Sequence, residues 1–213
     1  MKNTRSWILL GGILLIGAVF LLLDFRVAAS NTQTGKLIFT TDMGENMPVH
    51  MQRRDKISIV LVGEGPLVRA LQKALPEQIG KAGIGESDVV QELESVYQHP
   101  VLVVKVSEPD PIWTPFFAIS HFSVTAGYAT NGDPTFMGRL DKTQPYIRNP
   151  DPSVINLYTE YEVSDRSLGL ISRLGYHQYL ADYLAQEIVQ TLKNLYNIQS
   201  LTGQNLHISG LLF

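Results

Sequence analysis

The chain has 213 residues, of which 45% are apolar and 17% charged, with a formal net charge of −3 and no cysteine. This length and apolar content allow one ordinary folded domain and exclude a disordered or low-complexity chain. The lack of cysteine excludes disulfides, thiolate metal sites and cysteine nucleophiles, and the charge balance gives no overall field that would attract nucleic acid.

The first thirty residues carry the clearest signal in the sequence. Lys2 and Arg5 precede a run of 17 uncharged residues, Trp7–Leu23, which Asp24 closes. A helix over this run would be roughly 25 Å long, slightly shorter than the hydrocarbon core of a bilayer at roughly 30 Å. We predict a transmembrane anchor over residues 7–23, preceded by a basic N-terminus, residues 1–6, on the cytoplasmic side.

A cleaved signal peptide is the alternative interpretation of this segment. The small residues up to Ala29 fit a cleavage site, but the apolar run is longer than the 7–15 residues typical of a signal peptide, and charges precede the cut. Both interpretations export the rest of the chain, either as the bulk of a single-pass membrane protein or as a secreted or periplasmic protein cut after Ala29. Without Lys2 and Arg5, 15 of the 17 basic residues remain against 20 acidic ones, a net charge of −5 that does not favour anionic lipid.

Residues 24–35 are predicted to be a polar tether, and residues 36–213 one extracytoplasmic domain. Because a strand, helices and a strand follow one another in the first half of this domain, we expect a crossover between parallel neighbours. The predicted elements of this half are strands at 36–41 and 57–62, a helix from Pro66 that Pro76 bends or ends, a second helix capped by Ser87 and Asp88, and a strand at 101–104.

From Phe117 to Thr130 the apolar period changes to two, which places His121, Ser123 and Thr125 on the polar side of a strand. The remaining predicted elements are a strand at 154–163, a turn at 164–167, a long amphipathic helix at about 174–196 and an edge strand at 206–213. This order of elements predicts an α+β domain in two layers, with a mixed sheet packed against helices and the long C-terminal helix lying across the sheet.

No catalytic or metal-binding motif is assembled in the sequence. Gly63-Glu64-Gly65 stands between a strand and a helix but lacks the third glycine of a dinucleotide fingerprint, so we interpret it as a turn. The five histidines show no paired metal-ligand spacing. His121 and Ser123 lack the surroundings of a nucleophile elbow and are interpreted as the polar face of a strand. We therefore expect no cofactor and no metal.

Two segments are candidate surfaces for a partner. The first is an aromatic cluster between prolines at residues 109–117, for which burial in the core is the alternative. The second is the long loop at residues 133–153, because loops longer than about 12–15 residues are often functional. The candidate contact residues are Trp113, Phe116, Phe117, Arg139, Tyr146 and Arg148.

Together these observations favour a non-catalytic binding domain of the bacterial envelope that is anchored in the membrane by its N-terminal helix and contacts an envelope protein, not nucleic acid. One alternative is an envelope hydrolase assembled in space, which predicts a polar cleft with a perturbed carboxyl group or histidine. Another is a small-ligand carrier, which requires an apolar pocket beneath the long helix.

Overall fold

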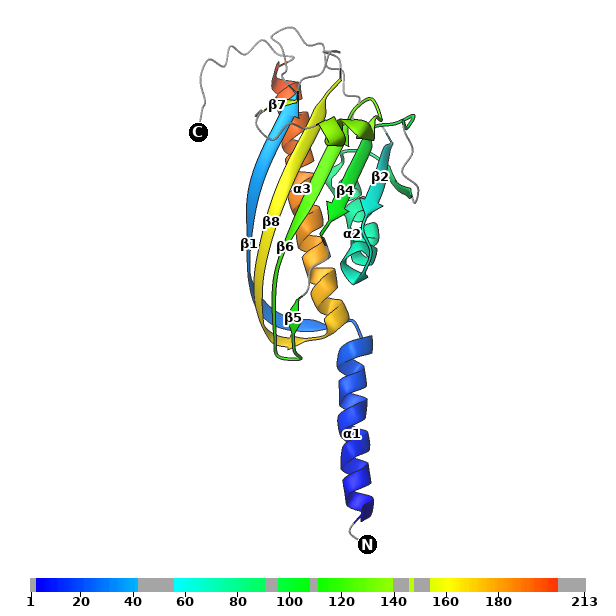
Figure 1. Cartoon of the computed structure of the whole chain (residues 1–213), viewed down its shortest axis with the longest axis vertical. Helices are drawn as coiled ribbons and strands as arrows, with labels where there is room; N and C mark the ends of the chain where they lie inside the picture. Colours follow the sequence, from blue (N-terminus) through cyan, green and yellow to red (C-terminus); the bar gives the residue numbers. More distant parts are fainter. Residues whose placement is uncertain are drawn as a thin grey trace.

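The computed structural model describes the backbone of residues 3–41, 56–90, 96–107, 111–139, 146–147 and 154–202. One sheet runs through the domain, and a helix extends from one end of it as a separate rod (Figure 1). The helices are α1 (Asn3–Leu22), α2 (Pro66–Ala82), the 3-10 helix η1 (Pro134–Arg139) and α3 (Arg173–Thr202). The strands are β1 (Arg26–Thr41), β2 (Ile57–Val62), β3 (Ser87–Val90), β4 (Val101–Val106), β5 (Ile112–Trp113), β6 (Phe117–Ala129), β7 (Tyr146–Ile147) and β8 (Asn156–Ile171).

The strand order is β3-β2-β4-β6-β8-β1-β7, and β5 is added beside β6. The sheet is mixed, because β2 lies parallel to β3 and β4 whereas β4, β6, β8 and β1 pair antiparallel in turn. The predicted crossover between parallel β2 and β4 is present, with α2 in the connection. The prediction of an α+β fold with a mixed sheet packed against helices is thus confirmed.

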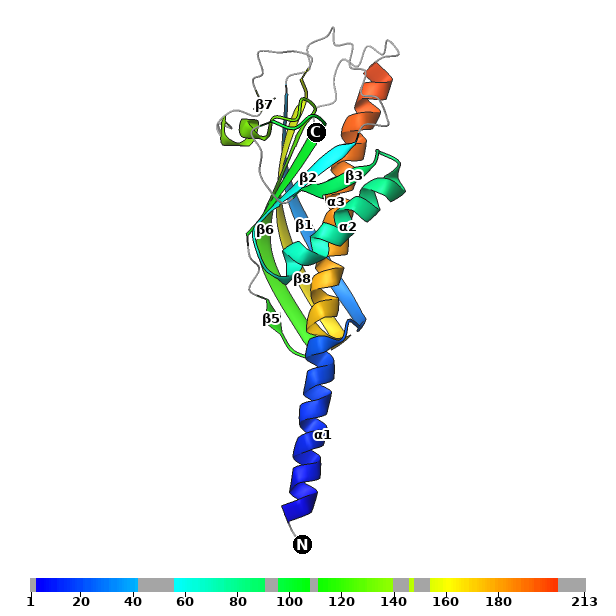
Figure 2. The same ribbon diagram turned by 90° about the vertical axis from the view of Figure 1, so that its right-hand side faces the viewer.

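Helices α2 and α3 cover one face of the sheet (Figure 2). The alternation expected for β6 is observed, since Phe122, Val124 and Tyr128 are buried beneath the helices while His121 and Ser123 are exposed on the other face. A second, smaller core cluster lies on that other face and includes Phe136 of η1. Among the residues that the structure describes, no helix combines the length and hydropathy needed to cross a membrane.

Helix α2 continues through Pro76, which was expected to bend or end it, and stops at Gly83 in the left-handed conformation (φ 67°). A proline inside a helix removes a hydrogen bond and costs about 3 kcal/mol. Leu75 and Ile79 are fully buried on either side of Pro76, and burying such a side chain stabilises by about 1.5–3 kcal/mol. Packing against α3 and the sheet therefore outweighs the local helix-breaking tendency.

Two further predictions of secondary structure are wrong for a common reason, which is pairing with a distant strand. Ser87–Val90 forms strand β3 beside β2 rather than the start of a helix. Residues 30–35, expected to belong to a tether, lie inside β1 and pair with β8 along their whole length. The predicted edge strand at residues 206–213 lies outside the described residues.

A row of polar side chains crosses the helix-covered face where the turn at residues 164–167 was predicted. Strand β8 continues through residues 164–167 instead of turning there. Asp165 is only 1% exposed and points toward α3. Its carboxyl group accepts hydrogen bonds from Thr32 on β1 (2.6 Å), Ser167 on β8 (2.9 Å) and Tyr176 on α3 (2.9 Å). Burial raises the pKa of the Tyr176 phenol, which also contacts Ser120 of β6 at 2.9 Å. The Asp165 carboxyl thereby joins β1 and β8 to the long helix, and Tyr176 adds a contact with β6.

We expect Asp165→Ala to lower the free energy of unfolding by about 3 kcal/mol, because it removes the acceptor of three hydroxyl groups in a buried site. Urea unfolding of the full chain, followed by circular dichroism, measures this change. The matched control is Glu162→Ala, an exposed carboxyl on the same strand, which should change the stability by no more than about 0.5 kcal/mol. Equal effects of the two substitutions would show that the polar row is not a stabilising feature.

Candidate functional site

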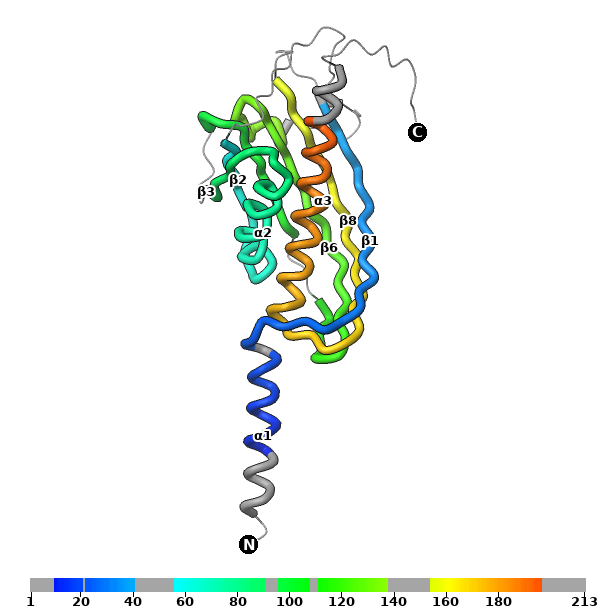
Figure 3. The backbone as a smooth tube through the Cα atoms, turned by 180° about the vertical axis from the view of Figure 1, so that it is seen from behind, coloured from blue at the N-terminus to red at the C-terminus, as the bar shows by residue number. Residues whose placement is uncertain are grey.

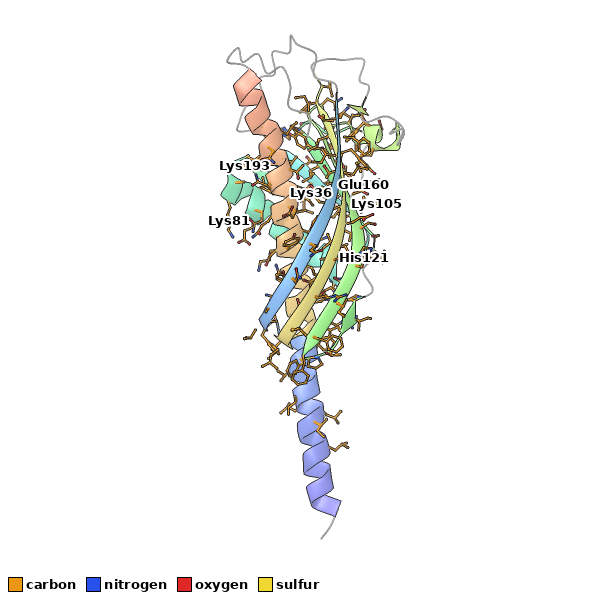
Figure 4. All side chains as sticks on the ribbon, turned by 90° about the vertical axis from the view of Figure 1, so that its left-hand side faces the viewer. Lys36, Lys81, Lys105, His121, Glu160 and Lys193 are labelled. Carbon is orange, nitrogen blue, oxygen red and sulfur yellow. The ribbon has the colours of Figure 1, made fainter. Side chains whose placement is uncertain are left out.

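A groove of about 590 Å³ lies on the uncovered face of the sheet, where β4, β6 and β8 run side by side and η1 borders them. Each strand contributes alternate side chains to it, because every second residue of a strand points to the same face. The residues that line the groove are Lys105, Ser107, Ser123, Val124, Thr125, Met137, Tyr158, Glu160, Tyr161 and Glu162. Of these, Val124 and Tyr161 have their side chains buried in the main core on the other face of the sheet. Figure 4 shows Lys105 and Glu160 on this open face, toward the end of the domain far from α1.

Two serines close one side of the groove and fix the end of β4 to β6. The Ser107 amide donates to the Ser123 carbonyl oxygen at 3.1 Å, and the Ser123 amide donates to Ser107 Oγ at 3.0 Å. Their hydroxyl groups lie 2.9 Å apart. Both hydroxyls are thus engaged in holding β4 and β6 together at this side of the groove.

The other side of the groove is formed by β8. The Tyr158 hydroxyl donates to Glu160 Oε1 at 2.7 Å. Burial, and next the hydrogen bond to Glu160, raises the pKa of Tyr158 to about 12. The phenol therefore remains protonated at neutral pH and acts as a hydrogen-bond donor.

Tyrosine titration tests this description of the groove. In a UV-difference titration of the full chain, Tyr158→Phe should remove a phenolate transition near pH 12. Glu160→Gln should lower the pKa of Tyr158, yet leave it above the ordinary value of 10.0, because burial is the larger cause of the shift. Glu162→Gln, the next outward-facing carboxyl on the strand, is the control and should leave the transition unchanged. A Tyr158 transition at pH 10 would contradict the observed packing.

The exposed face next to the groove holds a histidine–serine contact that differs from the one considered in the sequence. His121 Nδ1 lies 2.8 Å from Ser164 Oγ on β8, while Ser123 is bonded to Ser107. The structure records no acidic side chain hydrogen-bonded to His121 in the part of the chain that it describes. Nor do the described residues contain a group of three His, Cys, Asp or Glu side chains that could hold a metal ion.

The predicted contact residues are divided between the two ends of the domain. Trp113 is half-buried against the main core, whereas Phe116 is 66% and Phe117 36% exposed, close to where α1 leaves the domain. Arg139 ends η1, two residues after the groove residue Met137, and Tyr146 begins β7 opposite Thr40. The side chains of Arg139 and Tyr146, and all of Arg148, lie outside what the structure describes.

Sequence reasoning did not find the groove itself. It placed Ser123 and Thr125 on the polar face of one strand, but gave no reason to join them to Glu160 and Glu162 of the strand predicted at 154–163. The register that sets Ser123 opposite Glu162 and Thr125 opposite Glu160 is a property of the folded sheet. Alternating polar residues on two strands were the available signal, and they do not reveal which strands become neighbours.

Neither the protein-family models nor the curated protein sequences include a match to this chain. Among solved structures, a variant of the PelC dodecamer from Paraburkholderia phytofirmans is similar at 13% identity and a TM-score of 0.37, over 78% of this chain and 98% of that one. A second PelC dodecamer structure from the same organism has 12% identity and a TM-score of 0.37, over 71% and 95%. A minor lipoprotein from Acinetobacter baumannii has 13% identity and a TM-score of 0.34, over 66% and 94%. We therefore infer function from the chain's own geometry.

Proposed function

We propose that this chain is an anchored binding domain of the bacterial envelope, in which α1 lies in a membrane and the groove on the open sheet face contacts an envelope protein. The observation that carries the proposal is the exposure of apolar side chains all around α1. Ile13, Leu14, Leu15 and Ile16 are each between 59% and 69% exposed. Four consecutive residues exceed one helical turn, so no face of this part of α1 packs against the domain.

A helix that is apolar on every side and has no protein core around it is suited to lipid. The uncharged run in the sequence begins at Trp7, before the first side chain that the structure describes, and ends at Leu23. Lys2 and Arg5 favour a cytoplasmic N-terminus and an exported domain. These features support a single-pass anchor.

The structure also supports retention of the anchor over cleavage after Ala29. A cut there would remove Arg26, Val27, Ala28 and Ala29 from β1, where they pair with the last residues of β8. It would also remove Phe25, whose amide donates to Ser172 Oγ at 3.0 Å and whose carbonyl oxygen accepts from the Ser172 amide at 3.0 Å. A cleavage site within a fully paired strand would leave part of the sheet without its neighbour.

The groove suits a protein segment better than a reaction. It presents one cation, Lys105, and two carboxyl groups, Glu160 and Glu162, together with hydroxyl groups. A polar segment with basic side chains would complement the two carboxyls, which favours such a partner. The predicted contact Arg139 follows the groove residue Met137 by two residues, so the second candidate surface, the loop at residues 133–153, would extend the groove.

The two alternative functions receive less support from the geometry. The interface between α3 and the sheet is filled by buried side chains of the main core, where a small-ligand carrier would need an apolar pocket. The histidine whose pKa is lowered by burial, His177, lies in α3 and donates from Nδ1 to the Arg173 carbonyl oxygen at 2.7 Å. It is therefore not the perturbed cleft histidine that the hydrolase hypothesis requires.

Site-specific crosslinking tests the proposal in native membranes. A photo-crosslinking residue in place of Glu162 in the full-length chain should capture one dominant protein, because Glu162 lines the groove. The same residue in place of Glu77, an exposed glutamate on α2, should capture none. Adding Lys105→Glu should strengthen the crosslink, because a third carboxyl attracts the basic partner more strongly, whereas the matched Lys193→Glu on α3 should leave it unchanged.

Two results would contradict the proposal. Equal capture from positions 162 and 77 would show that the groove is not a preferred contact. A crosslink that Lys105→Glu weakens, or that Lys105→Glu and Lys193→Glu change to the same extent, would show that the groove does not attract a basic partner through its own charges.

A further inference from the structure

Exposed apolar side chains gather at the end of the domain from which α1 extends. Outside α1 and Leu23, eleven large apolar side chains are exposed in the described part of the chain, and eight of them lie at this end. We call these eight the apolar rim. The rim consists of Val27, Ile112, Phe116, Phe117, Ile119, Leu168, Leu170 and Leu174, with exposed fractions from 36% to 73%.

The sheet brings the rim together from four separate segments. Phe117 of β6 pairs with Leu168 of β8, and Leu170 pairs with Val27 of β1. The turn between β5 and β6 is held to the same place, because the Phe116 carbonyl oxygen accepts from the Gly169 amide at 2.9 Å. Residues that alternate with the rim, such as Ser167, are buried, so the rim occupies one face of the paired strands.

The strands bend at this point, which turns that face toward α1. Figure 3 shows the beginning of β1 running across the lower end of the domain before it rises along the sheet. Gly169 lies in the bend with a φ of 139°, and a Cβ atom there would meet the Val27 carbonyl oxygen at 2.4 Å. Only glycine lets the two strands approach so closely while bending.

The connection to α1 is short and tightly held. Three residues, Asp24, Phe25 and Arg26, separate Leu23 from Val27, so Val27 lies within about 14 Å of the end of the apolar run. Phe25 is fixed to the start of α3 by its two backbone hydrogen bonds with Ser172, and its ring packs edge-on against Phe20 of α1 at 5.0 Å between centroids. A Cβ atom on Gly175 would collide with the Phe25 carbonyl oxygen at 2.4 Å, so the start of α3 packs directly against the segment that connects α1 to β1.

The charges beside the rim also suit a lipid surface. Arg166 and Arg173 are exposed next to it, and Arg26 stacks its guanidinium 3.7 Å from the ring centroid of Tyr179. Asp24 is the one exposed acidic side chain of this end among the described residues. Basic and apolar side chains together are typical of surfaces that lie at the boundary between headgroups and acyl chains.

We infer that the α1 end of the domain rests on the bilayer, with the apolar rim in the boundary between lipid headgroups and acyl chains and the arginines among anionic headgroups. The inference rests on the proposed anchoring by α1 and adds a second, folded contact with the same membrane. It assigns Phe116 and Phe117 to lipid rather than to a protein partner. It also sets the orientation of the domain, because a seated rim would point the groove away from the membrane.

Nitroxide accessibility tests the inference in the full chain, since the absence of native cysteine allows single-site labelling. The chain is reconstituted in vesicles of phosphatidylethanolamine and phosphatidylglycerol with a label at Leu168→Cys or, separately, Phe116→Cys. The control is Leu37→Cys, a 52% exposed leucine on β1. Leu37 pairs with Glu160 and so lies farther from α1 than the rim. Leu14→Cys, on α1, reports the anchor itself. Circular dichroism checks that each labelled chain is folded.

We expect labels at 168, 116 and 14 to collide more often with oxygen, which partitions into lipid, than with a water-soluble nickel complex, and the label at 37 to show the reverse. If 14 is in lipid while 168 and 116 behave like 37, the rim does not touch the bilayer and this inference is wrong, although the anchor stands. If 14 also behaves like 37, the anchor and the inference both fail.

Discussion

Asp165 lies where segments far apart in the sequence meet, and the remaining architecture depends on that meeting. Its carboxyl group binds Thr32 near the start of the domain and Tyr176 near the start of the last helix. A buried carboxyl is costly unless its oxygens are hydrogen-bonded, and here three hydroxyl groups bond it. The need to satisfy this one group therefore fixes β1, β8 and α3 in a single arrangement just above α1.

The polar row also explains how the α1 end of the domain can be well ordered although its outside is apolar. In most domains apolar residues point to the core and polar ones to water. At this end the inner face of β1 and β8 carries Thr32, Asp165 and Ser167, and the outer face carries Val27, Leu168 and Leu170. Polar side chains inside and apolar side chains outside are favourable only where the outer face contacts an apolar medium instead of water. This arrangement is consistent with a membrane below the domain.

The two faces of the sheet consequently serve different purposes. α2 and α3 cover one face and, with the strand side chains beneath them, form the main core. The other face stays open along β6, β8 and β1, with the apolar rim at one end and the groove toward the other. In the proposed function, this arrangement would hold the groove clear of the lipid.

Local patterns in the sequence were sufficient to predict the elements whose apolar residues follow a strong period. The alternation of β6 and the wide apolar face of α3 predicted both elements and their buried sides. The pattern failed at Ser164–Ser167, where turn-forming residues lie in the middle of a strand, and at Ser87, where a capping residue begins a strand. In both places backbone pairing with a distant strand and hydrogen bonds from another element outweigh a preference worth about 1 kcal/mol.

The sequence by itself determined an apolar N-terminal segment, an α+β domain and the absence of any cysteine chemistry, because hydropathy, period and composition are local properties. Only the tertiary structure decided which polar side chains became a buried network, which became the groove, and which apolar ones stayed outside. Those outcomes depend on strand register: Thr125 opposite Glu160 forms the groove and Thr32 opposite Asp165 forms the network. A shift by one residue would exchange the two faces of a strand, and no local pattern specifies the partner that sets the register.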